Sequence, residues 1–402
     1  MGVNTHLPYG NTPYYNNWPQ VLSALQNLGI RHLRDGYFDP AWGPPLAERH
    51  QQLAQSNIHT DYTLPTNYFS GLTVQSVQQL ASEVSDMEVV EFPNECDNAG
   101  SCGATAALSL SNMIAFGPTV DAAASALNLS VIGPSFAAAA SYAKVGNLSS
   151  MMTYNNLHAY FAGRNPGNSG YGSFDSEGNS YGSIPYELDQ ANLDGPGLPV
   201  QITETGYISY PGTPQAGTIP EDTEESYIPR TFAMAYLSGI RRTYIYEFLD
   251  EVNSPGYGMV DSSLNPKPSY YAIQNLISNL ADPGTSFTPG TLAYSVSGGG
   301  STLKQLLLQK HDGSFWLLMW LEQSSFDPVN LVYTPVTPQS VTLTLGGSYY
   351  VSSVGTFNTA GSLNWTSTQT TGQTLTVSIS DQISIVHIPA QSTAGTIQTK
   401  LG

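Results

Sequence analysis

The chain has few basic residues and no long apolar run, and each shortage excludes a class of function. Of its 402 residues only 12 are Lys or Arg, against 30 Asp and Glu, so the formal net charge is -18. Nucleic-acid backbones are bound by clustered cations, so we expect no nucleic-acid partner. No apolar run approaches the roughly 20 residues of a membrane-spanning helix, so we expect no membrane partner either.

Cysteine is almost absent as well. Cys96 and Cys102 are the two cysteines, separated by a short Gly-containing segment. Two thiols without a His-rich motif nearby cannot complete a four-ligand metal site, so we expect no metal and no cofactor. We favour a small loop-closing disulfide, with two free thiols as the alternative. Together with a charged fraction of only 10%, this predicts a secreted or extracytoplasmic protein whose leader is absent from this sequence.

Short apolar runs alternate with amphipathic stretches over the first part of the chain, residues 1–284. Pro19 and Gly29 bracket one such helix, and Thr73 is a candidate cap for another. Eight strands that alternate with helices predict an α/β fold, a closed (β/α)8 TIM barrel. The expected strands are residues 2–5, 30–34, 58–64, 88–92, 129–133, 153–158, 200–203 and 243–248.

After residue 284 the apolar pattern changes to a period of two. This predicts an antiparallel β-sandwich domain over residues 285–390 and a flexible tail over 391–402. Asp312-Gly313 predicts a tight hairpin between two of its strands. The strand at 314–321 is apolar on both faces, so we expect one face to pack inside the sandwich and the other against the barrel.

Two segments place a glutamate where an apolar run ends. Glu95 closes the run Phe92-Pro93-Asn94-Glu95, and Glu204 follows Val200-Gln201-Ile202-Thr203. In a parallel barrel the carboxyl ends of the strands meet at one face, so both carboxylates are expected at the same mouth. Cleavage of a glycosidic bond needs one group to donate a proton to the departing oxygen and another to attack or stabilise the sugar cation. We therefore predict Glu95 and Glu204 as the catalytic pair.

Polar side chains at other strand ends are expected to assist this pair. Asn94 directly precedes Glu95, and its amide can hold a sugar hydroxyl. Arg34 ends the second strand and can hydrogen-bond a carboxylate, although an ion pair with Asp35 is an alternative. His158 and Tyr160 end the sixth strand on the same side, where the tyrosine hydroxyl can donate to a carboxylate; the alternative is that they are barrel residues.

Aromatic rings are the remaining candidates for substrate contacts. Glu247 and Phe248 end the eighth strand, where a sugar-stacking platform is expected. Trp42 and Tyr207 are further candidates for stacking. The long Gly-rich and Tyr-rich segment at 163–183 is expected to form either a cleft wall or a surface loop.

The strand-end pattern resembles the retaining glycoside hydrolases of clan A. Asn94-Glu95 ends the fourth strand, and Glu204 ends the seventh. Arg34 comes after the second strand, and the motif His158-x-Tyr160 comes after the sixth. The run at 266–272, followed by a sandwich, is similar to the end of the barrel in glycoside hydrolase families 39 and 30 and in some members of family 5. This resemblance implies that Glu95 is the acid/base, Glu204 the nucleophile and Asn94 the contact to the sugar 2-hydroxyl, with Arg34 and Tyr160 orienting the nucleophile.

One departure concerns the eighth strand, which usually ends in Trp in these families. No Trp occurs between Trp42 and Trp316, so Tyr246 or Phe248 is expected to take that place. The resulting hypothesis is a retaining hydrolase that cleaves β-linked bonds in a neutral polysaccharide or oligosaccharide by double displacement. A transglycosylase on the same fold and a non-catalytic carbohydrate-binding barrel are the alternatives.

Overall fold

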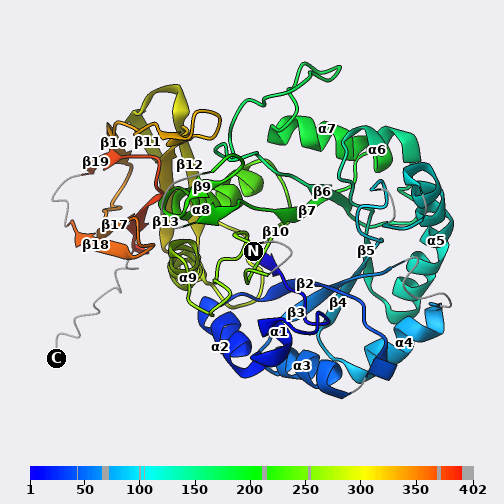
Figure 1. The fold of residues 1–402 in the computed structure, drawn as a ribbon. Helices are drawn as coiled ribbons and strands as arrows, with labels where there is room; N and C mark the ends of the chain where they lie inside the picture. Colours follow the sequence, from blue (N-terminus) through cyan, green and yellow to red (C-terminus); the bar gives the residue numbers. More distant parts are fainter. Residues whose placement is uncertain are drawn as a thin grey trace, which may run out of the picture.

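The computed structural model describes residues 1–42, 44–65, 72–98, 101–103, 105–210, 215–251, 255–368 and 373–391, with only the backbone at residues 42 and 44. Eight parallel strands in the order β5-β4-β3-β2-β1-β10-β7-β6 form the first part (Figure 1). An isolated parallel bridge between Ile132 and Tyr154 joins the two outer strands and completes the barrel. The strands are β1 Gly2–Asn4, β2 His32–Gly36, β3 His59–Thr63, β4 Met87–Glu91, β5 Ser130–Ile132, β6 Asn155–His158, β7 Val200–Thr205 and β10 Arg242–Ile245.

Helices surround this barrel on its outside (Figure 1). They are α1 Pro13–Asn16, α2 Trp18–Leu28, α3 Pro44–Gln55, α4 Val74–Glu83, α5 Ala106–Leu127, α6 Ala140–Val145, α7 Ile184–Asp194, α8 Glu221–Leu237 and α9 Pro268–Leu280, with the short 3-10 helix η1 Pro40–Trp42. The predicted end signals hold. Gly29 ends α2 at φ 80, a left-handed conformation that suits glycine, and Thr73 caps α4 in a reciprocal pair of hydrogen bonds with Ser76.

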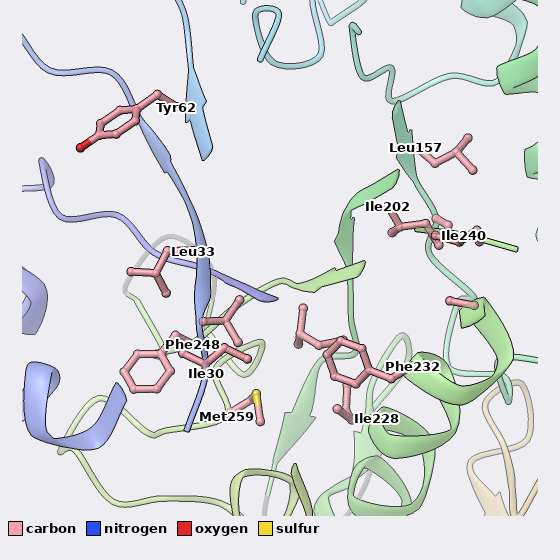
Figure 2. Close-up of a cluster of buried hydrophobic side chains, with 14 of the residues drawn as sticks. Ile30, Leu33, Tyr62, Leu157, Ile202, Ile228, Phe232, Ile240, Phe248 and Met259 are labelled. Atoms are coloured by element: carbon pink, nitrogen blue, oxygen red, sulfur yellow. The ribbon is translucent and has the colours of Figure 1, made fainter. Parts of the chain in front are cut away.

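The core of the barrel region is built from the apolar faces of these strands and helices. Ile30, Leu33, Ile202 and Phe232 lie in one buried cluster between the strands and the outer helices (Figure 2). Two short strands, β8 Ser209–Tyr210 and β9 Ile219–Pro220, form a small parallel ladder beside α8. No helix in the described ranges is both long and apolar enough to cross a bilayer.

The C-terminal part is antiparallel, as predicted, with sheets β11-β16-β19 and β12-β13-β20-β17-β18 and the short pair β14-β15. Asp312-Gly313 lies in the tight turn between β12 and β13, where Gly313 adopts φ 82. The strands are β11 Tyr294–Gly298, β12 Leu303–Gln309, β13 Phe315–Leu321, β14 Phe326–Asp327, β15 Val332–Tyr333, β16 Gln339–Leu345, β17 Ser353–Phe357, β18 Leu363–Ser367, β19 Thr374–Ile379 and β20 Ser384–Ile388, with the 3-10 helix η2 Gly300–Thr302. The predicted boundary at residue 284 stays a prediction, and residues 392–402 of the expected tail lie outside the described residues.

Strand β13 joins the two parts through its opposite faces. Leu317 and Met319 lie in the core between the two sheets. Leu318 and Trp320, on the other face, belong to the same buried cluster as the barrel residues. The alternation of two apolar faces along one strand therefore places the C-terminal region against the barrel.

Candidate active site

Glu95 and Glu204 converge at the barrel mouth. Glu204 lies in β7, and Glu95 follows β4 in a turn where its own backbone adopts φ 44. A non-glycine residue in this left-handed region is uncommon and is seen most often at functional sites. A carboxylate oxygen of each glutamate and a ring nitrogen of His158 all lie within 4.8 Å of one another. The two carboxylates therefore face a shared centre.

Glu204 is held by two hydrogen-bond donors, one on β2 across the barrel and one just after β6. Arg34 in β2 donates from Nη1 to Oε1 at 2.6 Å, and Tyr160 donates from Oη to Oε2 at 3.0 Å. The side chain of Glu204 is 11% exposed, so these charge-assisted bonds act in a largely buried setting where they are strong. They hold the carboxylate in one fixed orientation.

Arg34 is itself fixed by a buried carboxylate beneath the site. Glu91 in β4 accepts from Arg34 Nε at 2.9 Å and from Nη2 at 2.7 Å, a two-point pairing that sets the guanidinium plane. Nη2 also donates to Asn94 Oδ1 at 2.7 Å. Asp35, the alternative partner, instead accepts from Thr5 and from the backbone of Leu7. Arg34 therefore links the nucleophile candidate to the strand before Asn94-Glu95.

Glu95 has a different surrounding from Glu204. His158 Nδ1 lies 2.8 Å from its Oε1, and Asn98 donates from Nδ2 to its Oε2 at 2.9 Å. Burial raises the pKa of Glu95, but the hydrogen bond and charge of His158 outweigh it, so the pKa of Glu95 lies below its usual value. His158 Nδ1 is also 3.5 Å from Glu204 Oε2, which places this ring between the two glutamates.

The loop that carries Glu95 is tied down on its outer side. Cys96 and Cys102 form a disulfide with Cα atoms 5.1 Å apart. Asp97 accepts hydrogen bonds from the backbone N–H groups of Ala137 and Ala138, in the segment that follows β5. These contacts join the two loops beside Glu95.

Three predicted substrate contacts lie elsewhere or cannot be assessed. Phe248 is fully buried beside Ile30 and Met259 (Figure 2), so the prediction of a stacking platform is wrong for this ring. Tyr207 is also buried, and its hydroxyl donates to the backbone oxygen of Arg164 at 3.0 Å, so it is not a stacking surface either. The side chain of Trp42 lies outside the described residues.

Glu247 is buried as well, and its neighbours are protein groups. Its Oε2 lies 3.1 Å from His6 Nδ1, and Glu251 Oε1 lies 3.3 Å from the same nitrogen. Burial lowers the pKa of His6, but the two carboxylates raise it to about 10. His6 is therefore charged at neutral pH and supplies the positive charge that a metal would otherwise provide to this cluster. The prediction of a direct sugar contact by the fully buried Glu247 is wrong.

Sequence reasoning missed several residues at the site. Tyr257 packs edge-on against both Tyr160 and Tyr246, and the charge of Glu204 adds to the burial that raises its pKa. Tyr246 is half-buried in this group, so it stays the candidate for the missing Trp. Asn98 and Tyr257 lie on loops, and no local pattern announces which loop residues reach a barrel mouth.

A cavity of about 240 Å³ adjoins the acid/base candidate. Glu95, His158 and Tyr160 line it together with the aromatic residues Tyr171 and Tyr181. The described part of the chain holds two groups of side chains that could ligate a metal, the His6 cluster and Glu95 with His158 and Glu204. The second group consists of the two glutamates predicted as the catalytic pair and His158.

Comparison with known proteins supports the fold. No protein-family model and no curated protein matches the chain by sequence. Among solved structures, a family 39 glycoside hydrolase from the gut symbiont Bacteroides cellulosilyticus WH2 is similar, with a TM-score of 0.60 and 14% identity over 97% of this chain and 80% of that one.

Two further structures agree with it. A glucosidase from Croceicoccus marinus has a TM-score of 0.55 at 11% identity, covering 92% of each chain. A family 51 arabinofuranosidase from Xanthomonas axonopodis pv. citri has a TM-score of 0.54 at 12% identity, covering 95% of this chain and 91% of that one. The predicted TIM barrel with a C-terminal antiparallel region is confirmed, and its structural neighbours are glycoside hydrolases.

Proposed function

We propose that the protein is a retaining glycoside hydrolase that acts by double displacement. The separation of the two carboxylates carries this proposal. Retaining enzymes hold their carboxyl groups about 5–5.5 Å apart, whereas inverting enzymes need about 6.5–9.5 Å to admit a water. One oxygen of Glu95 lies within 4.8 Å of one oxygen of Glu204, a close approach that favours the shorter, retaining separation.

Glu204 is the nucleophile in this proposal because its donors fix the orientation of its carboxylate beside Glu95. Arg34 and Tyr160 occupy one lone pair on each oxygen, which leaves a second lone pair for attack at the sugar carbon. Asn94 accepts from Arg34 through Oδ1, so its amide N–H groups remain to donate to a sugar hydroxyl.

Glu95 is the acid/base in this proposal, and whether it carries a proton depends on whether substrate or water lies beside it. In the free protein His158 favours the carboxylate form. A bound sugar displaces water from Glu95, which adds to the burial that already favours the neutral form, so substrate binding promotes protonation. Glycosylation then removes the charge of Glu204, the pKa of Glu95 falls again, and Glu95 can accept a proton from the attacking water.

We propose a neutral, β-linked polysaccharide or oligosaccharide as the substrate. Arg34 is the cation at the two glutamates and is already engaged with Glu91 and Glu204, so a uronic acid carboxylate would compete with the nucleophile for it. Two structural neighbours, a glucosidase and an arabinofuranosidase, carry names that denote neutral sugars. The disulfide beside the site supports our proposal of an extracytoplasmic location.

The test is removal of each carboxylate followed by chemical rescue. Glu204→Ala and Glu95→Ala should each lose nearly all hydrolysis of an aryl glycoside without unfolding. Azide should restore turnover in both variants, with the inverted glycosyl azide from Glu204→Ala and the retained one from Glu95→Ala. Glu48→Ala, an exposed residue in α3, is the matched control.

Substantial hydrolysis by either active-site variant would contradict the assignment. A transglycosylase differs only in the acceptor of the glycosyl intermediate, so product analysis at high sugar concentration distinguishes it. A non-catalytic carbohydrate-binding barrel would bind oligosaccharides without any turnover in the wild type.

A further inference from the structure

The segment between β6 and α7 forms an ordered wall beside the cavity. Its two sides pair through backbone hydrogen bonds from Tyr171 to Tyr181 and from Asp175 to Asn179. The rings of Tyr171 and Tyr181 meet edge-on with centroids 5.5 Å apart, and both line the cavity that contains Glu95. Phe174, at the far end of the same pairing, is 74% exposed and is not among the lining residues.

A single carboxyl group, that of Glu187, lines this cavity besides Glu95. Glu187 lies in the first turn of α7 and is only 7% exposed. Its carboxyl accepts a hydrogen bond from the backbone of Gly182, and none of the ion pairs among the described residues includes it. A buried carboxyl without a cation is costly to place in a core, so its position at a cavity wall indicates a polar ligand.

Because the cavity lies beside Glu95, the role of Glu95 indicates which part of a substrate the cavity can bind. A general acid donates its proton to the glycosidic oxygen, and that oxygen leaves with the departing sugar. A cavity lined by Glu95 therefore adjoins the leaving-group side of the cleaved bond. Half-exposed tyrosine rings offer apolar faces to a sugar ring, and a carboxyl group offers hydrogen bonds to its hydroxyls.

We propose that this cavity binds the sugar on the leaving-group side, with Tyr171 and Tyr181 packing against a neutral ring and Glu187 hydrogen-bonding its hydroxyls. The inference rests on the proposed function and adds the residues that select the leaving group. Burial raises the pKa of Glu187 to about 7. The carboxyl is thus partly protonated near neutral pH and can both donate hydrogen bonds to sugar hydroxyls and accept them.

The test compares two substrates that share one glycone. The first is whichever of β-glucosyl, β-xylosyl or β-galactosyl fluoride the wild type cleaves, and the second is a β-linked disaccharide of the same sugar. Fluoride has no leaving-group sugar, so it reports on Glu204 and the glycone alone. Glu187→Leu and Tyr181→Ala should lower kcat/KM for the disaccharide by about tenfold or more and change that for the fluoride less than about threefold.

Phe174→Ala is the matched control, since it removes an aromatic ring from the same segment away from the cavity. Equal losses on both substrates, or no loss on either, would overturn the inference. A loss by Glu187→Gln confined to a glucosamine disaccharide would show that the site selects a cation instead of a neutral sugar, and would overturn it too.

Calorimetry separates failure of this inference from failure of the proposed function. Cellotriose and xylotriose are titrated into the wild type and into Tyr181→Ala. If the wild type cleaves no glycoside but binds a trisaccharide in a Tyr181-dependent manner, the cavity stands as a sugar site while hydrolysis fails. If neither cleavage nor Tyr181-dependent binding is found, both proposals are wrong.

Discussion

Glu322→Gln tests how firmly the C-terminal β region is joined to the barrel. Glu322 follows β13 and accepts from Arg230 of α8 through both oxygens, at 3.2 Å from Nε and 2.6 Å from Nη2. Trp320 Nε1 and Asn165 Nδ2 donate to the same carboxylate at 2.6 and 2.7 Å. Both charged side chains are almost fully buried. The amide leaves Arg230 without its main counter-charge in a buried site.

Breaking a buried ion pair by removing one charge costs about 3–5 kcal/mol. If the whole chain of 402 residues unfolds as one unit, an unfolding entropy of about 2.1 cal/mol/K per residue converts this loss into a fall in Tm of about 4–6 °C. If only the C-terminal region of roughly 100 residues unfolds, the same loss gives about 14–24 °C on that transition. The size of the shift therefore reports whether the two parts unfold together.

Differential scanning calorimetry of the wild type, Glu322→Gln and the exposed control Glu48→Gln provides the measurement. Burial raises the pKa of Glu322, but Arg230 and the other donors lower it below its usual value. The stabilisation is thus present above the usual carboxyl pKa and is lost as the pH falls through the lowered pKa of the folded state. The difference in Tm between the wild type and Glu322→Gln should therefore become smaller in that acidic range. An unchanged Tm at neutral pH would refute the reasoning.

Two further predictions concern the loop of Glu95. His158→Phe removes the hydrogen bond that lowers the pKa of Glu95. Because the protonated form of Glu95 donates the proton, the alkaline limb of the pH profile of kcat/KM should move to higher pH. An unmoved limb would show that His158 does not set the pKa of the acid. The Cys96→Ser, Cys102→Ser double variant opens a small loop, which should lower the free energy of unfolding by about 2 kcal/mol and reduce kcat/KM, as denaturant titration and steady-state kinetics would show; unchanged values in both would contradict a structural role for the disulfide.

The barrel could be predicted because its buried strands read as short apolar runs between amphipathic helices. Every one of the eight expected strands is present, and Gly29 and Thr73 mark helix ends as predicted. The two glutamates could also be placed, since both come where an apolar run meets a polar turn. What joins them could not be derived from spacing, because the contact of Arg34 with Glu204 spans 170 positions.

The eighth barrel strand shows why the remaining contacts were harder to predict. Successive residues of a strand point to opposite faces, and the register between β7 and β10 shifts between Thr243 and Ile245. That irregularity cannot be seen in the sequence, and β10 ends at Ile245, before Tyr246 and Phe248, so strand alternation does not place these two rings. Glu91 of β4 pairs with Arg34 of β2 across 57 positions of the sequence, a contact that no local pattern shows.

The prediction that Tyr207 stacks on a sugar was wrong for a different reason. This residue comes three residues after Glu204, but the chain turns outward there, and its ring packs against Phe161 and Tyr227. Glu187 was missed because a glutamate in the first turn of a helix is ordinarily a favourable, exposed partner of the helix dipole. Only the folded β6–α7 segment buries it.

The carboxylate of Glu322 has a consequence for the modularity of this enzyme candidate. Besides Arg230 it holds Asn165 and the backbone of Gly167, at the root of the segment that bears Tyr171 and Tyr181. The C-terminal β region thus contacts and stabilises the segment at the rim of the barrel. Trimming the chain to a minimal barrel, or recombining this barrel with a foreign module, would loosen the rim and change substrate preference before it abolished folding.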